Sequence, residues 1–103
     1  MDIGIAIKTV RQHFGWSQQE LSERTGLTQA TISHIENGLK SPSKSSIKKI
    51  CDSFEIPEAI LYIMGMESSD VPGSRAKMFE KLFPDIKDIA IQIIGDRKSK
   101  LLK

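Results

Sequence analysis

Apolar residues recur along this chain at spacings of three and four, which is the period of an amphipathic helix. The first apolar stripe consists of Ile3, Ile7, Val10 and Phe14. It predicts a helix over residues 3–14 that stops at Gly15. No alternating apolar and polar run beside a two-residue turn indicates a β-hairpin, so the pattern predicts an all-α fold.

Two short helices are predicted next, each with its own start and stop signal. Ser17 and Glu20 form a capping-box pattern, in which the hydroxyl and the carboxylate both satisfy backbone N–H groups at a helix start. Gly26 suits the left-handed conformation that ends a helix, and Thr28 suits the cap of the following one. A short helix, a tight turn containing glycine and a second short helix constitute a helix-turn-helix motif.

The second of these helices stops near Asn37 and Gly38 and carries compact polar residues on its outward side. Ile32 and Ile35 are expected to hold it against the body while its N-terminal half projects. The DNA major groove is about 12 Å wide, and compact side chains that hydrogen-bond to base edges suit it. The candidate base-contacting residues are Gln29, Ala30, Thr31, Ser33 and His34.

Two further helices complete a unit that closes near Gly65. Pro42 and Ser43 begin the first of them, and its apolar stripe contains the single cysteine, Cys51. Ile56-Pro57 begins the second, because proline is tolerated in the first turn of a helix. Residues 1–65 are therefore a predicted five-helix domain, and residues 66–74 have the composition of a linker.

Residues 75–103 are predicted to form a helical extension. The pattern indicates a short helix from Arg75 to Phe83, a break at Pro84 and a longer amphipathic helix after it. The apolar side of the longer helix must be covered by the chain's own domain, a second copy, another protein or a membrane surface, and a second copy is favoured. The predicted self-association residues are Ile86, Ile89, Ile93 and Ile94.

The net charge of the chain is not informative, but the local distribution of its charges is. The chain has 103 residues, of which 15 are basic and 13 acidic, and a formal charge of +2 does not by itself indicate a polyanionic partner. Residues 39–49 are different, because they contain Lys40, Lys44, Lys48 and Lys49 with no acid. Such a patch suits either a solvated helix face or a phosphate backbone.

Several classes of function lack their signatures. Two histidines and one cysteine at unrelated spacings make neither a zinc site nor a Cys-His pair, and no Walker loop or GxGxxG stretch is present. We therefore expect no enzymatic activity, no catalytic residue, no metal and no cofactor. No apolar segment approaches the roughly 20 residues of a membrane span, and no secretion signal is visible, so a cytoplasmic location without a membrane partner is expected.

Many spaced residues between positions 3 and 65 form one pattern. They are Ser17-Gln18-x-Glu20-Leu21, Thr25-Gly26, Leu27-Thr28-Gln29, Ile32-Ser33-x-Ile35-Glu36-Asn37-Gly38, Pro42, Ile47 and Ile50. This pattern resembles the lambda-repressor and Cro-like helix-turn-helix family, also called XRE-type regulators. The resemblance implies a five-helix DNA-binding domain that acts as a homodimer on a pseudo-palindromic operator.

The resemblance also implies roles for individual residues. Gln29 is the implied base reader, because a carboxamide matches the N6 and N7 edge of adenine. Ala30 and Thr31 would present methyl groups to thymine, and Ser33 and His34 occupy the next outward positions. The implied phosphate contacts are Gln18, Asn37, Gly38, Lys40, Ser43 and Lys44, and Gly38 would contribute a left-handed backbone and a phosphate-facing N–H.

The chain departs from the family pattern in two places. Ser22 stands where alanine is usual, and it is small enough to keep the close approach of the two helices. The outward half of the recognition helix carries no arginine or lysine, which disfavours guanine readout and favours half-sites that contain A·T pairs.

The sequence thus indicates a bacterial or phage transcriptional regulator that represses by occupying double-stranded DNA as a homodimer. A protein-interaction module is the alternative, in which the C-terminal helix binds another protein as an antitoxin or an anti-regulator would.

Overall fold

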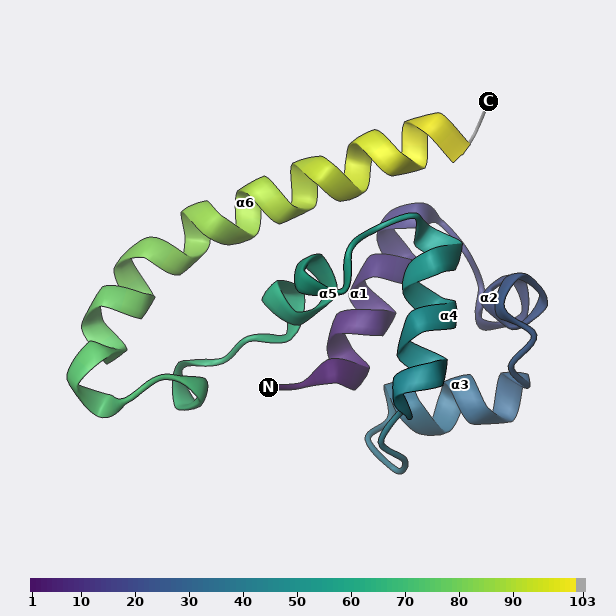
Figure 1. Ribbon diagram of the computed structural model, residues 1–103, viewed down its shortest axis with the longest axis horizontal. Helices are drawn as coiled ribbons and strands as arrows, with labels where there is room; N and C mark the ends of the chain where they lie inside the picture. The colour runs from purple at the N-terminus through teal and green to yellow at the C-terminus, as the bar shows by residue number, and fades with distance from the viewer. Residues whose placement is uncertain (102–103) are drawn as a thin grey trace.

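The computed structural model describes residues 1–101, and within this range all regular structure is helical (Figure 1). The all-α prediction is confirmed. The elements in chain order are α1 (Ile3–Phe14), α2 (Gln18–Thr25), α3 (Gln29–Glu36), α4 (Lys44–Phe54), α5 (Glu58–Gly65), the 3₁₀ turns η1 (Ser68–Asp70) and η2 (Gly73–Arg75), and α6 (Ala76–Leu101). The first five helices form one body, and α6 runs back across it.

Hydroxyl caps start three of these helices, as the sequence pattern predicts for Ser17 and Thr28. The backbone N–H of Glu20 donates to Ser17 Oγ at 3.0 Å, and that of Thr31 donates to Thr28 Oγ1 at 3.1 Å. Ser43 caps α4 in the same way. Each cap satisfies a backbone N–H that has no partner inside its helix.

One half of the predicted capping box is wrong. The carboxylate of Glu20 does not return to the backbone of Ser17; it accepts a hydrogen bond from Arg24 Nε at 3.0 Å. Arg24 in turn places its guanidinium carbon 4.0 Å from the ring centre of Trp16, which attracts the cation to the ring face. The side chain of Arg24 therefore draws Glu20 away from the helix start.

The core gathers around α1, which contacts α3, α5 and α6. Ala6, Ile7 and Val10 on α1 are almost fully buried, and so are Ile50 and Phe54 on α4. At one end of this core the ring centres of Phe14 and Phe54 lie 4.8 Å apart, and Trp16 stacks on Phe54 at 5.2 Å. Trp16 therefore packs within the domain rather than presenting its ring as a platform for bases.

The predicted break at Pro84 is wrong, because α6 is one continuous helix with Pro84 in its interior. A proline inside a helix removes one backbone hydrogen bond and crowds the preceding turn. Packing on both sides of it sustains the helix here. Phe79 and Phe83 stack with ring centres 4.6 Å apart before the proline, and Ala90 and Ile94 are buried after it.

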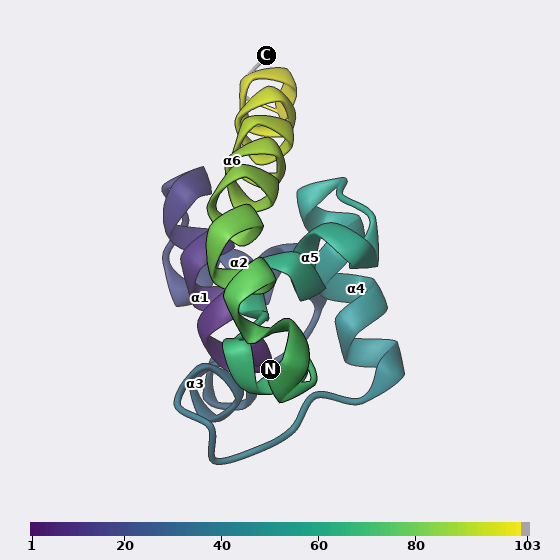
Figure 2. The same ribbon diagram turned by 90° about the vertical axis from the view of Figure 1, so that its left-hand side faces the viewer.

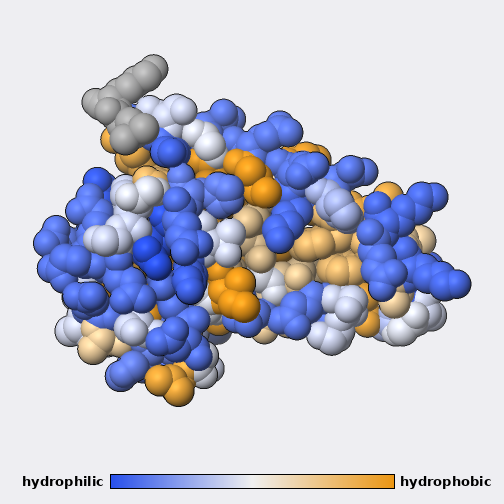
Figure 3. Space-filling model, turned by 180° about the vertical axis from the view of Figure 1, so that it is seen from behind, coloured by the Kyte–Doolittle hydropathy of each residue, from blue (hydrophilic) through white to orange (hydrophobic). Residues whose placement is uncertain are grey.

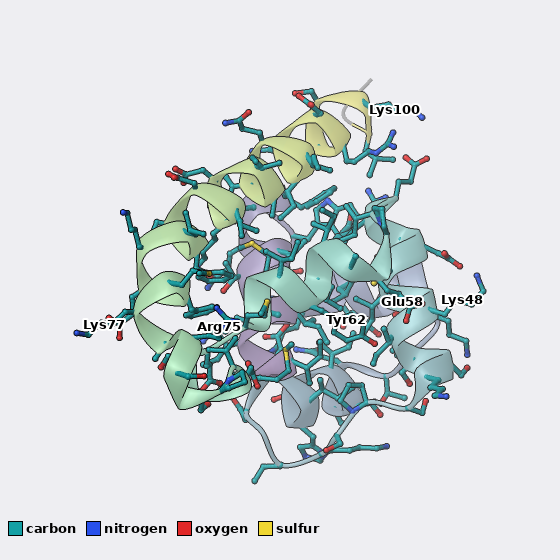
Figure 4. All side chains as sticks on the ribbon, turned by 60° about the vertical axis from the view of Figure 1, so that its left-hand side comes forward. Lys48, Glu58, Tyr62, Arg75, Lys77 and Lys100 are labelled. Carbon is teal, nitrogen blue, oxygen red and sulfur yellow. The ribbon has the colours of Figure 1, made fainter. Side chains whose placement is uncertain are left out.

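The second half of α6 is covered by the chain's own domain. It packs on α1, α5 and α4, as the two ribbon views show (Figures 1 and 2). Lys100 Nζ lies 3.8 Å from a carboxylate oxygen of Glu55, at the end of α4 (Figure 4). Ile94 is 0% exposed, so its inclusion among the predicted self-association residues is wrong. Within the described residues no helix is long and apolar enough to cross a membrane.

The segment between α5 and α6 is held at several points. The carboxylate of Asp70 accepts a hydrogen bond from the amino group of Met1 at 2.6 Å, which raises the pKa of that amine and lowers the pKa of Asp70. The backbone N–H of Asp2 also donates to the carbonyl of Gly65 at 2.8 Å. The start of α1 and the end of α5 are therefore joined before the chain turns into α6.

Candidate nucleic-acid interface

The turn between α2 and α3 is fixed by three hydrogen bonds between side-chain hydroxyls and the backbone. Ser22 Oγ donates to the carbonyl oxygen of Leu27 at 2.6 Å. Thr25 Oγ1 donates to the carbonyl oxygen of Leu21 at 2.7 Å and accepts from the N–H of Leu27 at 3.2 Å. Gly26 adopts a φ of 78°, the left-handed conformation that its position predicts. Ser22 thus does more than keep the helices close, because its hydroxyl ties α2 to the turn.

The inward side of α3 fixes the helix against the body. Ile32 and Ile35 are 1% and 2% exposed, as the sequence pattern predicts. Gly4 on α1 lies directly against the carbonyl oxygen of Ile35, so that a Cβ at this position would overlap it. The backbones of α1 and α3 therefore touch, and the orientation of α3 follows from this contact.

The outward side of α3 carries the five predicted base-contacting residues. Gln29, Ala30 and His34 are exposed, and Thr31 and Ser33 are half-buried. The Thr31 hydroxyl accepts a hydrogen bond from the Thr28 hydroxyl at 2.8 Å. The fold therefore places the whole set on one helix, with the amide of Gln29 unobstructed.

A buried ion pair joins α1 to the end of α3. Arg11 Nε donates to Glu36 Oε2 at 2.8 Å, and Arg11 Nη2 donates to Glu36 Oε1 at 2.9 Å. The third nitrogen of the guanidinium, Nη1, donates to the carbonyl oxygen of Trp16 at 2.7 Å. Planar guanidinium and carboxylate groups make strong bidentate pairs, and this one also fixes the connection that leads into α2.

The same pair positions Gln18 at the first turn of α2. The amide nitrogen of Gln18 donates to Glu36 Oε1 at 3.1 Å. One predicted phosphate-contacting side chain is therefore held in place by the end of α3. Sequence reasoning missed Arg11 and Glu36, and the available signal was a pair of opposite charges at the edges of two apolar stripes.

The loop after α3 uses its backbone groups internally. Gly38 has a φ of 77°, which agrees with the predicted left-handed backbone. Its N–H donates to the carbonyl oxygen of Ile35 at 3.1 Å, so the predicted phosphate-facing N–H of Gly38 is wrong. The carbonyls that end α3 capture this N–H, because they have no partner within the helix.

Predicted phosphate-contacting side chains flank the loop. Asn37, Lys40 and Lys44 are exposed, and within residues 1–101 neither lysine forms an ion pair. Lys48, farther along α4, is paired with Asp52 at 3.2 Å. The Ser43 hydroxyl is occupied by Ser46, so the unpaired N–H groups at the start of α4 are better placed to meet an anion than the hydroxyl is.

Within the described residues the side chains that could bind a metal lie apart, and the single cysteine is buried. No group of three His, Cys, Asp or Glu side chains is placed to hold a metal ion. Cys51 is 2% exposed, and burial raises the pKa of its thiol to about 11, with the carboxylates of Glu58 and Asp52 adding to the shift. The thiol is therefore neutral near pH 7 and packs as a small apolar group.

Known proteins are similar to the part of this chain that contains α2 and α3. The family model described as helix-turn-helix matches residues 7–61. Antitoxin HipB of Escherichia coli O6:H1 is 45% identical over 51 residues, which make up 50% of this chain and 54% of that protein. This chain thus spans about half the length of the antitoxin.

Two further relatives extend past the matched domain. The competence pilus inhibition repressor of Acinetobacter baylyi is 27% identical over 86 residues, 84% of this chain and 77% of that protein. The HTH-type transcriptional regulator SutR of Escherichia coli K12 is 29% identical over 86 residues, 80% of this chain and 48% of that protein.

Proposed function

Because this chain belongs to the helix-turn-helix family of XRE-type transcriptional regulators, we propose that it recognises a specific double-stranded DNA sequence through the outward side of α3. One observation carries the proposal. Buried Ile32 and Ile35 hold α3 from behind, while compact side chains, none of them lysine or arginine, occupy its projecting half. This is the geometry that direct readout in a major groove requires.

Gln29 is the proposed base reader. It is exposed in the first turn of α3, and a carboxamide donates to and accepts from the edge of adenine in two parallel hydrogen bonds. Ala30 and Thr31 supply methyl groups beside it, and Ser33 and His34 extend the surface along the helix. We therefore propose half-sites that contain A·T pairs.

Phosphate contacts on the two sides of α3 set its position on the DNA. Gln18 lies at the start of α2, where the helix dipole adds attraction for an anion. On the other side lie Asn37, Lys40 and Lys44, with the free N–H groups at the start of α4 beyond Ser43. Such contacts fix the register of the protein but carry no sequence information.

We further propose a homodimer that acts in the cytoplasm as a repressor, by covering a promoter that contains a pseudo-palindromic operator. The repressor role is proposed from occupancy, because a protein bound across a promoter excludes polymerase from the same DNA. A dimer doubles the number of phosphate contacts, so binding weakens steeply as salt rises.

In vitro selection of random duplex DNA at near-physiological salt tests the proposal. An enriched inverted repeat supports dimeric, sequence-specific recognition. Equal recovery of all sequences contradicts it, because phosphate contacts alone do not discriminate.

A second candidate function is that of an antitoxin. It is favoured by the relative named antitoxin HipB and by an apolar groove on the first half of α6, lined in part by Met78, Phe79 and Leu82. In this candidate the groove holds another protein while α3 still binds DNA. Co-purification of the tagged chain with one stoichiometric partner from its own host, lost on Leu82→Glu, is the expected result. A homodimer that already covers the groove contradicts the candidate.

A further inference from the structure

The first half of α6 carries a surface that the domain leaves uncovered. Four apolar side chains on one side of the helix, Met78, Leu82, Ile86 and Ile89, are 44–58% exposed. The first three of them line a groove of about 210 Å³ whose walls also include Val71 and Phe83. Seen from behind, apolar surface gathers at this end of the molecule, whereas the opposite end, with α2 and α3, is mostly hydrophilic (Figure 3).

The shape of the chain explains why this surface stays open. The second half of α6 lies on the body through Ala90 and Ile94, but the first half projects past α5 (Figures 1 and 2). The short turns η1 and η2 also contact α6, and Val71 and Arg75 from this segment line one side of the groove. Contiguous apolar surface of this kind marks an interaction site in proteins.

The charges beside the apolar side form a pattern with internal symmetry. Lys77 and Lys81 precede Asp85 and Asp88 along one flank of the helix, and all four are exposed. Figure 4 shows Lys77 pointing away from the body at the start of α6. Within residues 1–101 none of the four forms an ion pair, although Lys81 and Asp85 are one helical turn apart.

We propose that the first half of α6 pairs with the same segment of a second copy, antiparallel and with the two-fold axis beside Leu82. In this register Met78 packs against Ile86 of the second copy, and the two Leu82 side chains meet at the axis. Lys81 lies opposite Asp85 of the second copy, and Lys77 lies opposite its Asp88. The apolar residues and the charges are thus both self-complementary, which a two-fold interface requires.

The charges on this flank of α6 distinguish an antiparallel pair of helices from a parallel pair. An antiparallel pair brings the same flank of both helices together, so each lysine meets an aspartate. A parallel pair would bring opposite flanks together, so the four charges would face the flank that carries Phe79 and Phe83 and would find no oppositely charged partner. The order of the charges along α6 therefore selects the antiparallel arrangement.

This inference rests on the dimeric part of the proposed function and supplies its interface. It moves the predicted self-association surface along α6, away from Ile94 and toward Met78 and Leu82. The two α3 helices then lie on opposite sides of the axis, because α3 is at the other end of each copy (Figure 1). That arrangement suits an operator with two half-sites.

The test uses two full-length variants of opposite charge. Lys77→Glu with Lys81→Glu makes the flank wholly acidic, and Asp85→Lys with Asp88→Lys makes it wholly basic. By sedimentation without DNA, we expect the unaltered chain to be a dimer, and each variant alone to dissociate with a dissociation constant at least about tenfold higher. An equimolar mixture of the two variants is expected to form a 1:1 dimer again.

A control variant tests for a general effect of charge, and a second variant disrupts the apolar contact instead. Lys8→Glu with Lys49→Glu changes the net charge by as much as the acidic variant does, at exposed positions outside α6, and should leave the dimer intact. Leu82→Glu should give a monomer with unchanged helix content by circular dichroism, because this side chain is already 47% exposed.

Three outcomes would overturn the proposal: an unaltered chain that is monomeric, single-sign variants that remain dimeric, or a mixture that does not reassociate. Since no DNA is present, none of these outcomes bears on recognition of bases by α3. A chain that fails here and still selects a DNA sequence loses the interface but keeps the proposed readout.

Discussion

The guanidinium of Arg11 and the carboxylate of Glu36 meet in two hydrogen bonds of 2.8 and 2.9 Å between α1 and the last turn of α3. Both side chains are buried, and Gln18 and the carbonyl of Trp16 complete the set of polar contacts. One ion pair therefore links α1, the entry to α2 and the end of α3. Its loss should affect both stability and DNA binding.

Glu36→Ala is expected to lower the free energy of unfolding by about 3–5 kcal/mol, because it leaves the Arg11 charge buried without a partner. Urea denaturation followed by circular dichroism measures this change. The matched control is Glu20→Ala, which breaks the exposed pair with Arg24 and should cost at most about 0.5 kcal/mol. Equal losses for the two variants would contradict a special role for the buried pair.

Replacement of two helical glycines by alanine should have opposite effects. Gly4→Ala places a methyl group against the carbonyl of Ile35, so it should destabilise the domain and displace α3 from α1. Gly95→Ala, in α6, meets nothing within 4 Å and should stabilise by about 0.5–1 kcal/mol. Thermal unfolding of both variants checks the pair, and a neutral Gly4→Ala would show that α1 and α3 are not in close contact in solution.

Lys44→Ala should weaken binding to every DNA sequence by a similar factor. Its exposed ammonium at the start of α4 is assigned to a phosphate, so its removal should reduce the slope of log K against log salt by about 1 per monomer. Titrations at several salt concentrations on a specific and an unrelated duplex measure this. Lys87→Ala, which removes the same charge from α6, is the control, and an effect of Lys44→Ala confined to one base pair would contradict the phosphate assignment.

Cys51 should resist thiol reagents in the native state. Burial raises the pKa of its thiol from 9.0 to about 11, so the folded chain retains a proton that the unfolded chain loses between these values. Stability should therefore fall as pH rises from about 9 to about 11, and should not depend on this thiol at lower pH. Labelling with a disulfide reagent at pH 8, with and without urea, checks the burial, and rapid native labelling would contradict it.

Sequence patterns located the features that depend on neighbouring residues. The bounds of α1, the caps Ser17 and Thr28, the end of α2 at Gly26 and the inward position of Ile32 all follow from local spacing and local backbone chemistry. The candidate base-contacting side of α3 was predictable for the same reason, since a 3.6-residue period determines which residues face away from the core.

Features set by distant residues were not predictable in the same way. The contact of Arg11 with Glu36 spans 25 positions, and no local signal pairs them. The continuity of α6 through Pro84 depends on burial of Ala90 and Ile94 against other helices, which outweighs the local penalty of proline. The N–H of Gly38 is bonded to Ile35 because the end of α3 needs a cap, a competition that the family resemblance alone does not reveal.

The most direct test of sequence readout by α3 is parallel selection of random duplex DNA by the unaltered chain and by Gln29→Ala. The unaltered chain should enrich an inverted repeat with an A·T pair at one fixed position in each half. Gln29→Ala should lose the preference at that position, at a cost of about 1–3 kcal/mol on the original site, and keep the others. Failure of the unaltered chain to enrich any sequence, or identical preferences for the two proteins, would contradict the assignment of Gln29 and α3 to base recognition.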